Sequence, residues 1–155
     1  MNTDIRIAAV VMSAAVGETA QNLAKMEKWI VAAKGNRAAV VCFPEMSITG
    51  YHVREPIQAV AETVPGPSTD RLLAVSRKTG VTILAGLAEK GDAGHLYATH
   101  IVITPTGIIG CYRKVHPGPP EKHLFSTGDT VPVFASNGIT FGIQLCYDAH
   151  FPELA

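Results

Sequence analysis

The chain has 155 residues, of which 47% are apolar and 17% charged, and its acidic and basic side chains balance to a formal net charge of zero. This composition is typical of one water-soluble domain, residues 1–155, with a sizeable core, and it argues against a disordered chain. The balanced charge gives no general basic surface for nucleic acid, and no apolar run reaches the roughly 18 residues of a membrane helix.

The N-terminal segment and the cysteines both favour a reducing, cytoplasmic location. The first apolar run is short and is framed by Asp4 and Arg6, which is unlike a secretory signal peptide. Cys42, Cys111 and Cys146 are an odd number of cysteines at wide spacing. At least one thiol is therefore free, and no disulfide framework is expected.

The first half of the chain alternates between strand and helix patterns. The predicted elements, in chain order, are a strand over residues 5–12, a helix over 17–36, a strand over 38–43, a loop over 47–56 and a helix over 65–80. Both helices have an amphipathic pattern, which predicts one buried face for each. Gly35 and Asn36 should end the first helix through a left-handed cap, and Gly80 should end the second.

The second half is dominated by strand patterns. Predicted strands cover residues 81–89, 96–105, 108–115, 131–136 and 139–146. The TPTG sequence favours a hairpin between the second and third of these strands, and Asn137-Gly138 favours another between the last two. The proline-rich segment 116–129 has the composition of an irregular loop. The order of helices and strands predicts a layered α/β domain.

Three residues with possible chemical roles stand beside predicted strands. Glu45 comes just after one strand, Lys114 lies near the end of another, and Cys146 lies at the tip of the last. In layered α/β folds, active sites and ligand-binding sites commonly lie at the ends of strands. Taken singly, each has an ordinary explanation, as a turn cap, a solvated lysine and a core thiol. For Cys146, the polar YDAH sequence that follows argues against a buried core thiol.

The sequence around these residues resembles the carbon–nitrogen hydrolase, or nitrilase, superfamily. The resemblance rests on FPEMSITGY around Glu45, YRKVHPGPPEKHLFSTGD around Lys114 and GIQLCYDAHFPELA around Cys146, which stand in the family's order. It implies that these three residues form the catalytic set. It also implies supporting roles for Glu121 and for the backbone N–H of Tyr147. No metal and no cofactor are implied.

The resemblance further implies an α-β-β-α sandwich whose second half follows the cysteine motif. This chain ends soon after that motif, so we expect an incomplete sandwich with an uncovered apolar sheet face. Residues 151–155 would form only the first turn of the next helix. We therefore expect the chain alone to have little or no amidase activity, and the family leads us to expect a homo-oligomer.

The expected reaction is hydrolysis of a non-peptide carbon–nitrogen bond in a small amide, carbamoyl compound or nitrile. Cys146 would attack the substrate to form a thioester, Glu45 would accept and return the proton, and Lys114 would stabilise the developing charge. The CYDAHFPE sequence resembles the amidase and carbamoylase branches more than the nitrile-cleaving ones. Acyl transfer to an amine, and nitrile hydrolysis, use the same residues and stay open.

Three other interpretations stay open. The chain has six histidines, of which His116, His123 and His150 lie near the motifs and could pair with the cysteine. Possible metal ligands are Cys111, His116, Cys146 and His150. Their spacing matches no CxxC, HxxxH or HExxH pattern. The chain could also be a catalytically silent half-domain that serves as an interaction or structural subunit.

Overall fold

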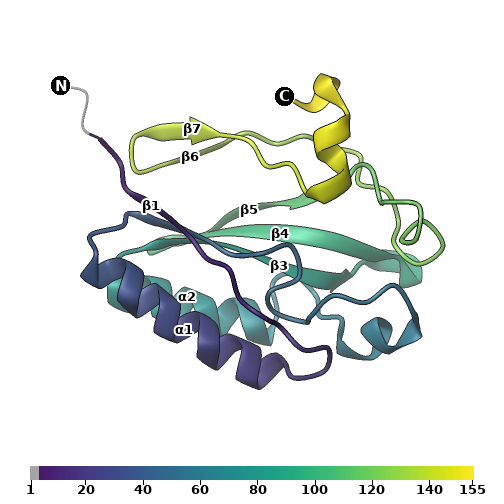
Figure 1. Ribbon diagram of the computed structural model, residues 1–155, viewed down its shortest axis with the longest axis horizontal. Helices are drawn as coiled ribbons and strands as arrows, with labels where there is room; N and C mark the ends of the chain where they lie inside the picture. The colour runs from purple at the N-terminus through teal and green to yellow at the C-terminus, as the bar shows by residue number, and fades with distance from the viewer. Residues whose placement is uncertain (1–3) are drawn as a thin grey trace.

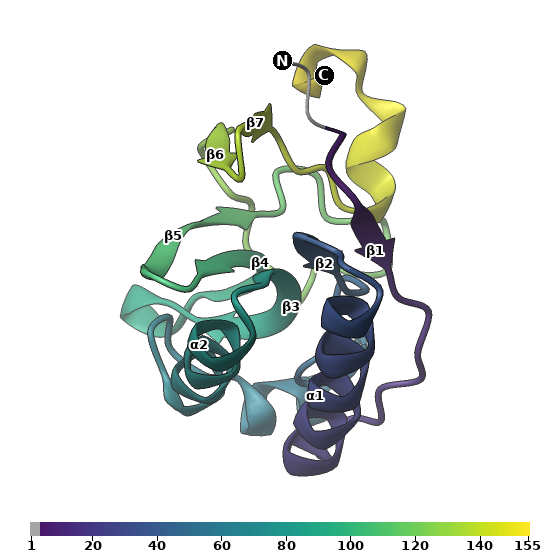
Figure 2. The same cartoon turned by 90° about the vertical axis from the view of Figure 1, so that its left-hand side faces the viewer.

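The computed structural model describes residues 4–155 and shows a layered arrangement (Figure 1). A five-stranded sheet lies in the middle, two α-helices cover one of its faces, and a two-stranded hairpin lies over the other (Figure 2). The strands are β1 Ile7–Ala9, β2 Val40–Cys42, β3 Thr82–Lys90, β4 Leu96–Thr104, β5 Gly107–Arg113, β6 Phe134–Ser136 and β7 Ile139–Phe141. The helices are α1 Thr19–Gly35 and α2 Pro67–Thr79, and short 3-10 helices cover Glu55–Val60, Asp92–Gly94, Cys146–His150 and Pro152–Leu154.

The main sheet follows the chain in the order β1-β2-β3-β4-β5. β1, β2 and β3 are parallel, and α1 and α2 lie in the connections between them. Parallel neighbours need such crossovers, whereas β3, β4 and β5 are antiparallel and are joined by short turns. The mixed sheet and its layer of helices confirm the predicted α/β class.

The helix layer is held on the sheet by apolar side chains. The buried residues of α1 include Leu23, Met26, Ile30 and Ala33, whose three- and four-residue spacing forms the apolar face of the predicted amphipathic helix. They belong to one core cluster with inward-facing side chains of β3. Burial of a large apolar side chain stabilises a fold by roughly 1.5–3 kcal/mol. β3 is buried along both faces up to Lys90. The helix layer covers one face, and on the other Leu84 packs with Phe134 of the hairpin while Ala88 packs in a cluster with Met46 and Phe125.

The turns follow the sequence predictions with one exception. Gly80 ends α2 in the left-handed conformation with φ +73°, and Asn137 and Gly138 have φ values of +53° and +78° between β6 and β7. The left-handed cap predicted for Gly35 and Asn36 is wrong, because Gly35 is the last residue of α1, Asn36 has a φ of −89°, and the left-handed residue is Arg37, with φ +59°. The side-chain amide of Asn36 donates to a carbonyl of the last turn of α1 at 2.9 Å, so it caps that helix without a left-handed backbone.

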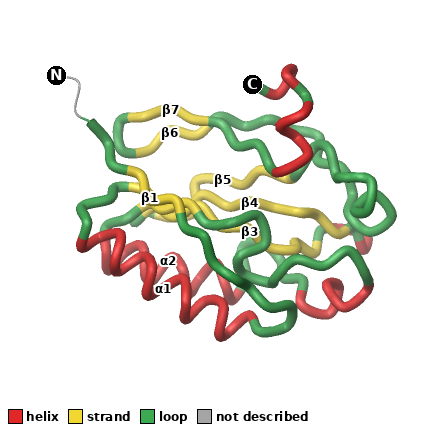
Figure 3. Tube along the Cα trace, in the orientation of Figure 1, coloured by secondary structure: helices red, strands yellow, loops and turns green. Residues whose placement is uncertain are grey.

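β1, β2, β6 and β7 are each shorter than predicted by at least three residues (Figure 3), and the difference at β7 bears on the site. β7 ends at Phe141, residues 142–145 have no strand partner among the described residues, and Cys146 opens a 3-10 helix. The prediction that Cys146 lies at the tip of a strand is therefore wrong. The physical reason is that β7 pairs with β6 over three residue pairs, and the ladder stops where β6 begins.

The β6–β7 hairpin begins a second sheet layer. Between it and the main sheet lies an apolar cluster of Val40, Leu84, Val102 and Phe134. The described layers thus run helix, sheet, sheet, which is part of the predicted α-β-β-α sandwich. Neither α-helix within residues 4–155 is long and apolar enough to cross a membrane.

Candidate active site

Glu45 is placed by the turn that follows β2. The Ser47 N–H donates to the Pro44 carbonyl at 3.1 Å and closes this turn. The neighbouring strand β3 holds the turn, because the Ile48 N–H donates to the Gly86 carbonyl at 2.9 Å and the Gly86 N–H donates to Ser47 Oγ at 3.3 Å. A Cβ on Gly86 would overlap the carbonyl oxygen of Glu45, so a glycine is required for this approach.

Lys114 is the first residue after β5, and its side chain is fully buried. Its backbone stays attached to neighbouring segments, because its N–H donates to the Ala98 carbonyl at 2.8 Å and its carbonyl accepts from Gly128 at 2.9 Å. The ammonium donates to Glu45 Oε1 at 2.7 Å and to Glu121 Oε2 at 2.8 Å. One buried cation is therefore shared by two carboxylates.

Glu121 lies in the predicted irregular loop, and its side chain is only 3% exposed. Besides the Lys114 ammonium, its carboxylate accepts hydrogen bonds from the Gly118 N–H and from the Tyr51 hydroxyl, the latter at 3.0 Å. The N–H groups of the residues three and four positions later donate to its backbone carbonyl. The loop is thus folded around Glu121, and Glu121 in turn orients Lys114.

The three charged groups differ in the direction of their pKa shifts. Burial raises the pKa of Glu45, and the hydrogen bond from Lys114 offsets this only in part. Burial also acts to raise the pKa of Glu121, but the Lys114 ammonium and the Gly118 N–H outweigh it and leave that pKa below its usual range. Burial alone would lower the pKa of Lys114, but its hydrogen bonds to both carboxylates leave it raised. Lys114 and Glu121 are therefore charged at neutral pH, and Glu45 is the one of the two carboxyl groups that holds a proton more readily than usual.

Cys146 is exposed at the start of the segment 145–151, which we call the Cys146 turn. Its φ of +48° is unusual for a residue with a side chain, and strained residues of this kind cluster at functional sites. Cys146 and Glu45 line the same cleft of about 380 Å³. The other lining residues are Cys42, Phe43, Leu84, His100, Gly142, Ile143, Gln144 and Leu145. The structure thus brings Glu45, Lys114 and Cys146 to one region, and their catalytic roles stay predictions.

Asp148 is a buried carboxylate that the sequence reasoning did not single out. Its exposure is 0%, and it accepts hydrogen bonds from the Tyr112 hydroxyl at 2.7 Å, the His116 N–H at 2.8 Å and the Leu145 N–H at 3.1 Å. The available signal in the sequence was its place two residues after Cys146, within the polar YDAH stretch. Two of its donors, Tyr112 and His116, lie 36 and 32 positions away, so local sequence could not indicate the network.

The histidine on the wall of the cleft is His100 of β4, which the sequence reasoning also missed. It is 3% exposed, burial lowers its pKa to about 4, and its Nδ1 has no hydrogen-bond partner among the described residues. The imidazole is therefore neutral at physiological pH. His116, His123 and His150, which were considered for a cysteine–histidine pair, are not among the residues that line the cleft with Cys146.

The remaining thiols and the metal hypothesis can be placed in the same region. Cys42 and Cys111 lie on β2 and β5, as predicted, and burial raises the pKa of each. Cys42 also borders the cleft. Within residues 4–155, no group of three or more His, Cys, Asp or Glu side chains is arranged to hold a metal ion.

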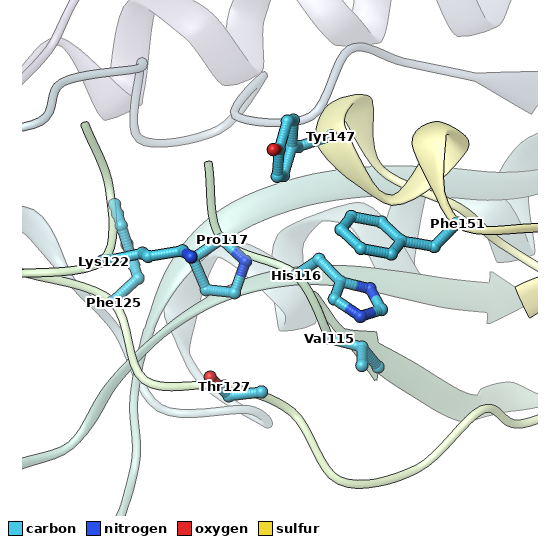
Figure 4. Close-up of a pocket in the computed structure, with 8 residues that line it drawn as sticks. All are labelled: Val115, His116, Pro117, Lys122, Phe125, Thr127, Tyr147 and Phe151. Carbon is cyan, nitrogen blue, oxygen red and sulfur yellow. The ribbon is translucent and has the colours of Figure 1, made fainter. Parts of the chain in front are cut away.

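A second hollow of about 470 Å³ lies beside the Cys146 turn (Figure 4). Its lining residues are Val115, His116, Pro117, Lys122, Phe125, Thr127, Tyr147 and Phe151. The rings of His116 and Phe151 are stacked with centres 3.6 Å apart, and the Tyr147 ring meets Phe151 edge-on at 5.5 Å. These ring contacts hold the Cys146 turn against the segment that follows Lys114.

Comparison with known proteins places this geometry in context. Residues 6–155 match the sequence model of a family described as carbon-nitrogen hydrolase. A protein named nitrilase from Pyrococcus abyssi is 39% identical over 155 residues, and an (R)-stereoselective amidase from a Pseudomonas species is 32% identical over 149 residues. The alignments cover 97% and 96% of this chain but 59% and 54% of those proteins. The chain thus spans little more than half the length of the curated relatives it matches.

Solved structures share the fold. Nit3 of Saccharomyces cerevisiae, described as a member of branch 10 of the nitrilase superfamily, superposes with a TM-score of 0.87 at 24% identity. A mutant of the amidase from Nesterenkonia sp. AN1 in complex with butyramide superposes with a TM-score of 0.84 at 23% identity. Each comparison covers 97% of this chain and 58% to 59% of the other. The described layers are therefore part of a nitrilase-type fold.

Proposed function

The chain belongs to the carbon–nitrogen hydrolase family, and on this basis we propose that Glu45, Lys114 and Cys146 are the catalytic residues of a hydrolase of small amides. The observation that carries the proposal is the Lys114 ammonium, fully buried between two carboxylates beside the cleft that Cys146 lines. Burying such charges opposes folding unless they are well paired, and strongly perturbed groups beside a cleft are typical of active sites.

The first chemical step forms a thioester. The Cys146 sulfur attacks the carbonyl carbon of the amide while its proton passes to Glu45. The carbonyl oxygen gains negative charge, which the Lys114 ammonium and the Tyr147 N–H stabilise. The carbon–nitrogen bond then breaks, the amine leaves with the proton that Glu45 held, and the acyl group stays on the sulfur.

The second step releases the acid. Water attacks the thioester carbon, Glu45 takes one proton from this water, and the sulfur leaves and recovers the proton from Glu45. The raised pKa of Glu45 supports this double role, because a group that accepts and returns a proton works best when its pKa approaches the working pH. Glu121 stays ionised and keeps the Lys114 ammonium in place.

Amides are the proposed substrate class ahead of nitriles and carbamoyl compounds. The support is the 32% identity to an (R)-stereoselective amidase together with the CYDAHFPE sequence around the nucleophile. The 39% identity to a protein named nitrilase keeps nitriles as the next class to be tested. Transfer of the acyl group to an amine in place of water would follow the same first step.

The test is mass spectrometry of the chain after incubation with butyramide. We expect a butyryl adduct on the peptide that contains Cys146, because the thioester forms before water cleaves it. The adduct should be absent from Cys146→Ala and present in the matched control Cys111→Ala. An adduct that persists in Cys146→Ala would contradict the mechanism.

A catalytically silent interaction subunit is the second candidate. It is favoured by large apolar side chains that are exposed among the described residues, such as Val11 at 93% and Val133 at 70%, because such groups favour contact with another chain. Thiol alkylation separates the candidates. Selective alkylation of Cys146 over Cys42 and Cys111 supports the enzyme, whereas a stable complex with an unreactive Cys146 supports the silent subunit.

A further inference from the structure

We infer that Asp148 is a positioning residue that fixes the Cys146 turn against the strand end that carries Lys114. This inference rests on the proposed function, because it assigns to Asp148 the task of placing the nucleophile. Its carboxylate is fully buried and accepts three hydrogen bonds, from the Tyr112 hydroxyl and from the backbone N–H groups of His116 and Leu145. A carboxylate with that number of donors is held in one orientation.

The donors flank the two reactive residues. Tyr112 and His116 stand two positions before and two positions after Lys114, and Leu145 stands directly before Cys146. Tyr112 and Leu145 donate to the same oxygen, Oδ2, at 2.7 and 3.1 Å, and His116 donates to Oδ1 at 2.8 Å. One carboxylate therefore connects both sides of the lysine to the backbone that delivers the thiol.

The turn is also closed from its own backbone. The Asp148 N–H donates to the Leu145 carbonyl at 3.0 Å while the Leu145 N–H donates to the Asp148 side chain, so Cys146 lies inside a reciprocal pair of hydrogen bonds. Cys146 has a φ of +48°, which a residue with a side chain adopts only when its surroundings impose it. The Asp148 contacts supply that restraint.

The imidazole of His116 contacts the turn through Phe151 and makes no hydrogen bond to Asp148. Its Nδ1 is 3.3 Å from Asp148 Oδ1, close enough for an ion pair, yet the atom has no hydrogen bond of acceptable geometry among the described residues. The ring is instead stacked on Phe151. The anchoring bond from His116 is therefore its backbone N–H, which a side-chain substitution would leave in place.

The experiment compares Asp148→Asn and Tyr112→Phe with the matched control Glu62→Gln. Glu62 is also a carboxylate that accepts from a hydroxyl and a backbone N–H, those of Ser68 at 2.7 and 2.9 Å, but it lies outside the site. The readout is the rate of iodoacetamide alkylation of Cys146 relative to Cys42 and Cys111 in the same molecule. Thermal unfolding is followed in parallel.

We expect Asp148→Asn to reduce the selectivity for Cys146 by about tenfold, and Tyr112→Phe to reduce it less, because misplacement of a reacting group lowers its rate steeply. Glu62→Gln should keep the wild-type selectivity even where the unfolding temperature falls.

Unchanged selectivity and unchanged butyramide acylation in folded Asp148→Asn would overturn the inference. If Asp148→Asn does not fold, the same comparison in Tyr112→Phe decides. If the wild type forms no butyryl adduct while Asp148→Asn still shifts alkylation, the proposed function fails and the positioning role stands.

Discussion

The Lys114 ammonium carries a full charge in a place that water does not reach, with a side-chain exposure of 0%. Burial alone would lower its pKa, but hydrogen bonds to Glu121 and Glu45 outweigh burial and raise it. Burial raises the pKa of Glu45 above its usual range even though Lys114 acts to lower it, whereas the pKa of Glu121 falls below its usual range because Glu121 also accepts from the Gly118 N–H. A pair of acids driven apart in this way can divide the roles of fixed charge and proton carrier.

Removing this charge should destabilise the fold. Lys114→Ala leaves two buried carboxylates without a cation, and we expect it to lower the free energy of unfolding in urea by about 3 kcal/mol or more. Lys122→Ala, a control at an exposed lysine of the same loop, should leave the unfolding midpoint close to that of the wild type. Adding Glu121→Gln to Lys114→Ala should recover part of the loss. If Lys114→Ala is as stable as the wild type, the ion pairs of Lys114 make no net contribution to the free energy of unfolding.

Between β2 and β3, the position of Glu45 depends on a close approach of two backbones. The turn after β2 is hydrogen-bonded to Gly86, and a side chain at that position would occupy the space of the Glu45 carbonyl oxygen. Gly86 is flanked by buried residues of β3, so the strand cannot move away without disturbing the core. The placement of the proposed base is therefore a property of how these two elements pack.

A methyl group at Gly86 should displace the turn. We expect Gly86→Ala to lower the free energy of unfolding by about 1–3 kcal/mol, as overpacking does, and to slow butyryl adduct formation on Cys146. Gly35→Ala is the matched control, because an added Cβ there meets no atom within 4 Å. It should be neutral or slightly stabilising, since alanine favours the last turn of α1. Equal effects of the two substitutions in urea unfolding would contradict this account.

The described molecule leaves several large apolar side chains exposed around the edge strand β1 and the second sheet layer. Val11 is 93% exposed, Val133 70% and Ile7 54%. β1 is an outer strand of the main sheet. The β6–β7 hairpin lies over the sheet face that the helices leave open, but its strands pair over only three residue pairs. Unpaired strand edges and exposed apolar groups favour association with another chain.

We therefore expect the 155-residue chain to self-associate, with the extent rising with concentration. Val11→Lys and Val133→Lys should each shift size-exclusion chromatography with light scattering toward the monomer, because a charge opposes burial of that surface. Val31→Lys is the control, at a side chain on α1 that is 61% exposed. A monomer at all concentrations, or an equal shift by the control, would contradict the prediction.

The sequence by itself determined the elements and the candidate residues. The three- and four-residue spacing of apolar residues predicts which face of α1 is buried, and the Asn137-Gly138 pair predicts a hairpin. Both predictions succeed because they depend only on residues close together in the sequence. The three motifs likewise identified Glu45, Lys114 and Cys146 without knowledge of the fold. These are local properties, and local sequence carries them.

Tertiary structure decided the contacts that join those residues into a site. Lys114 is shared by Glu45 and Glu121, which stand 69 and 7 positions away, and the Asp148 network reaches over 36 positions to Tyr112. The predicted strand over 139–146 stops at Phe141, because a strand persists only as far as a partner offers backbone groups to pair with. Sequence therefore predicts which residues carry chemistry, while burial and long-range pairing set their charge states and their positions.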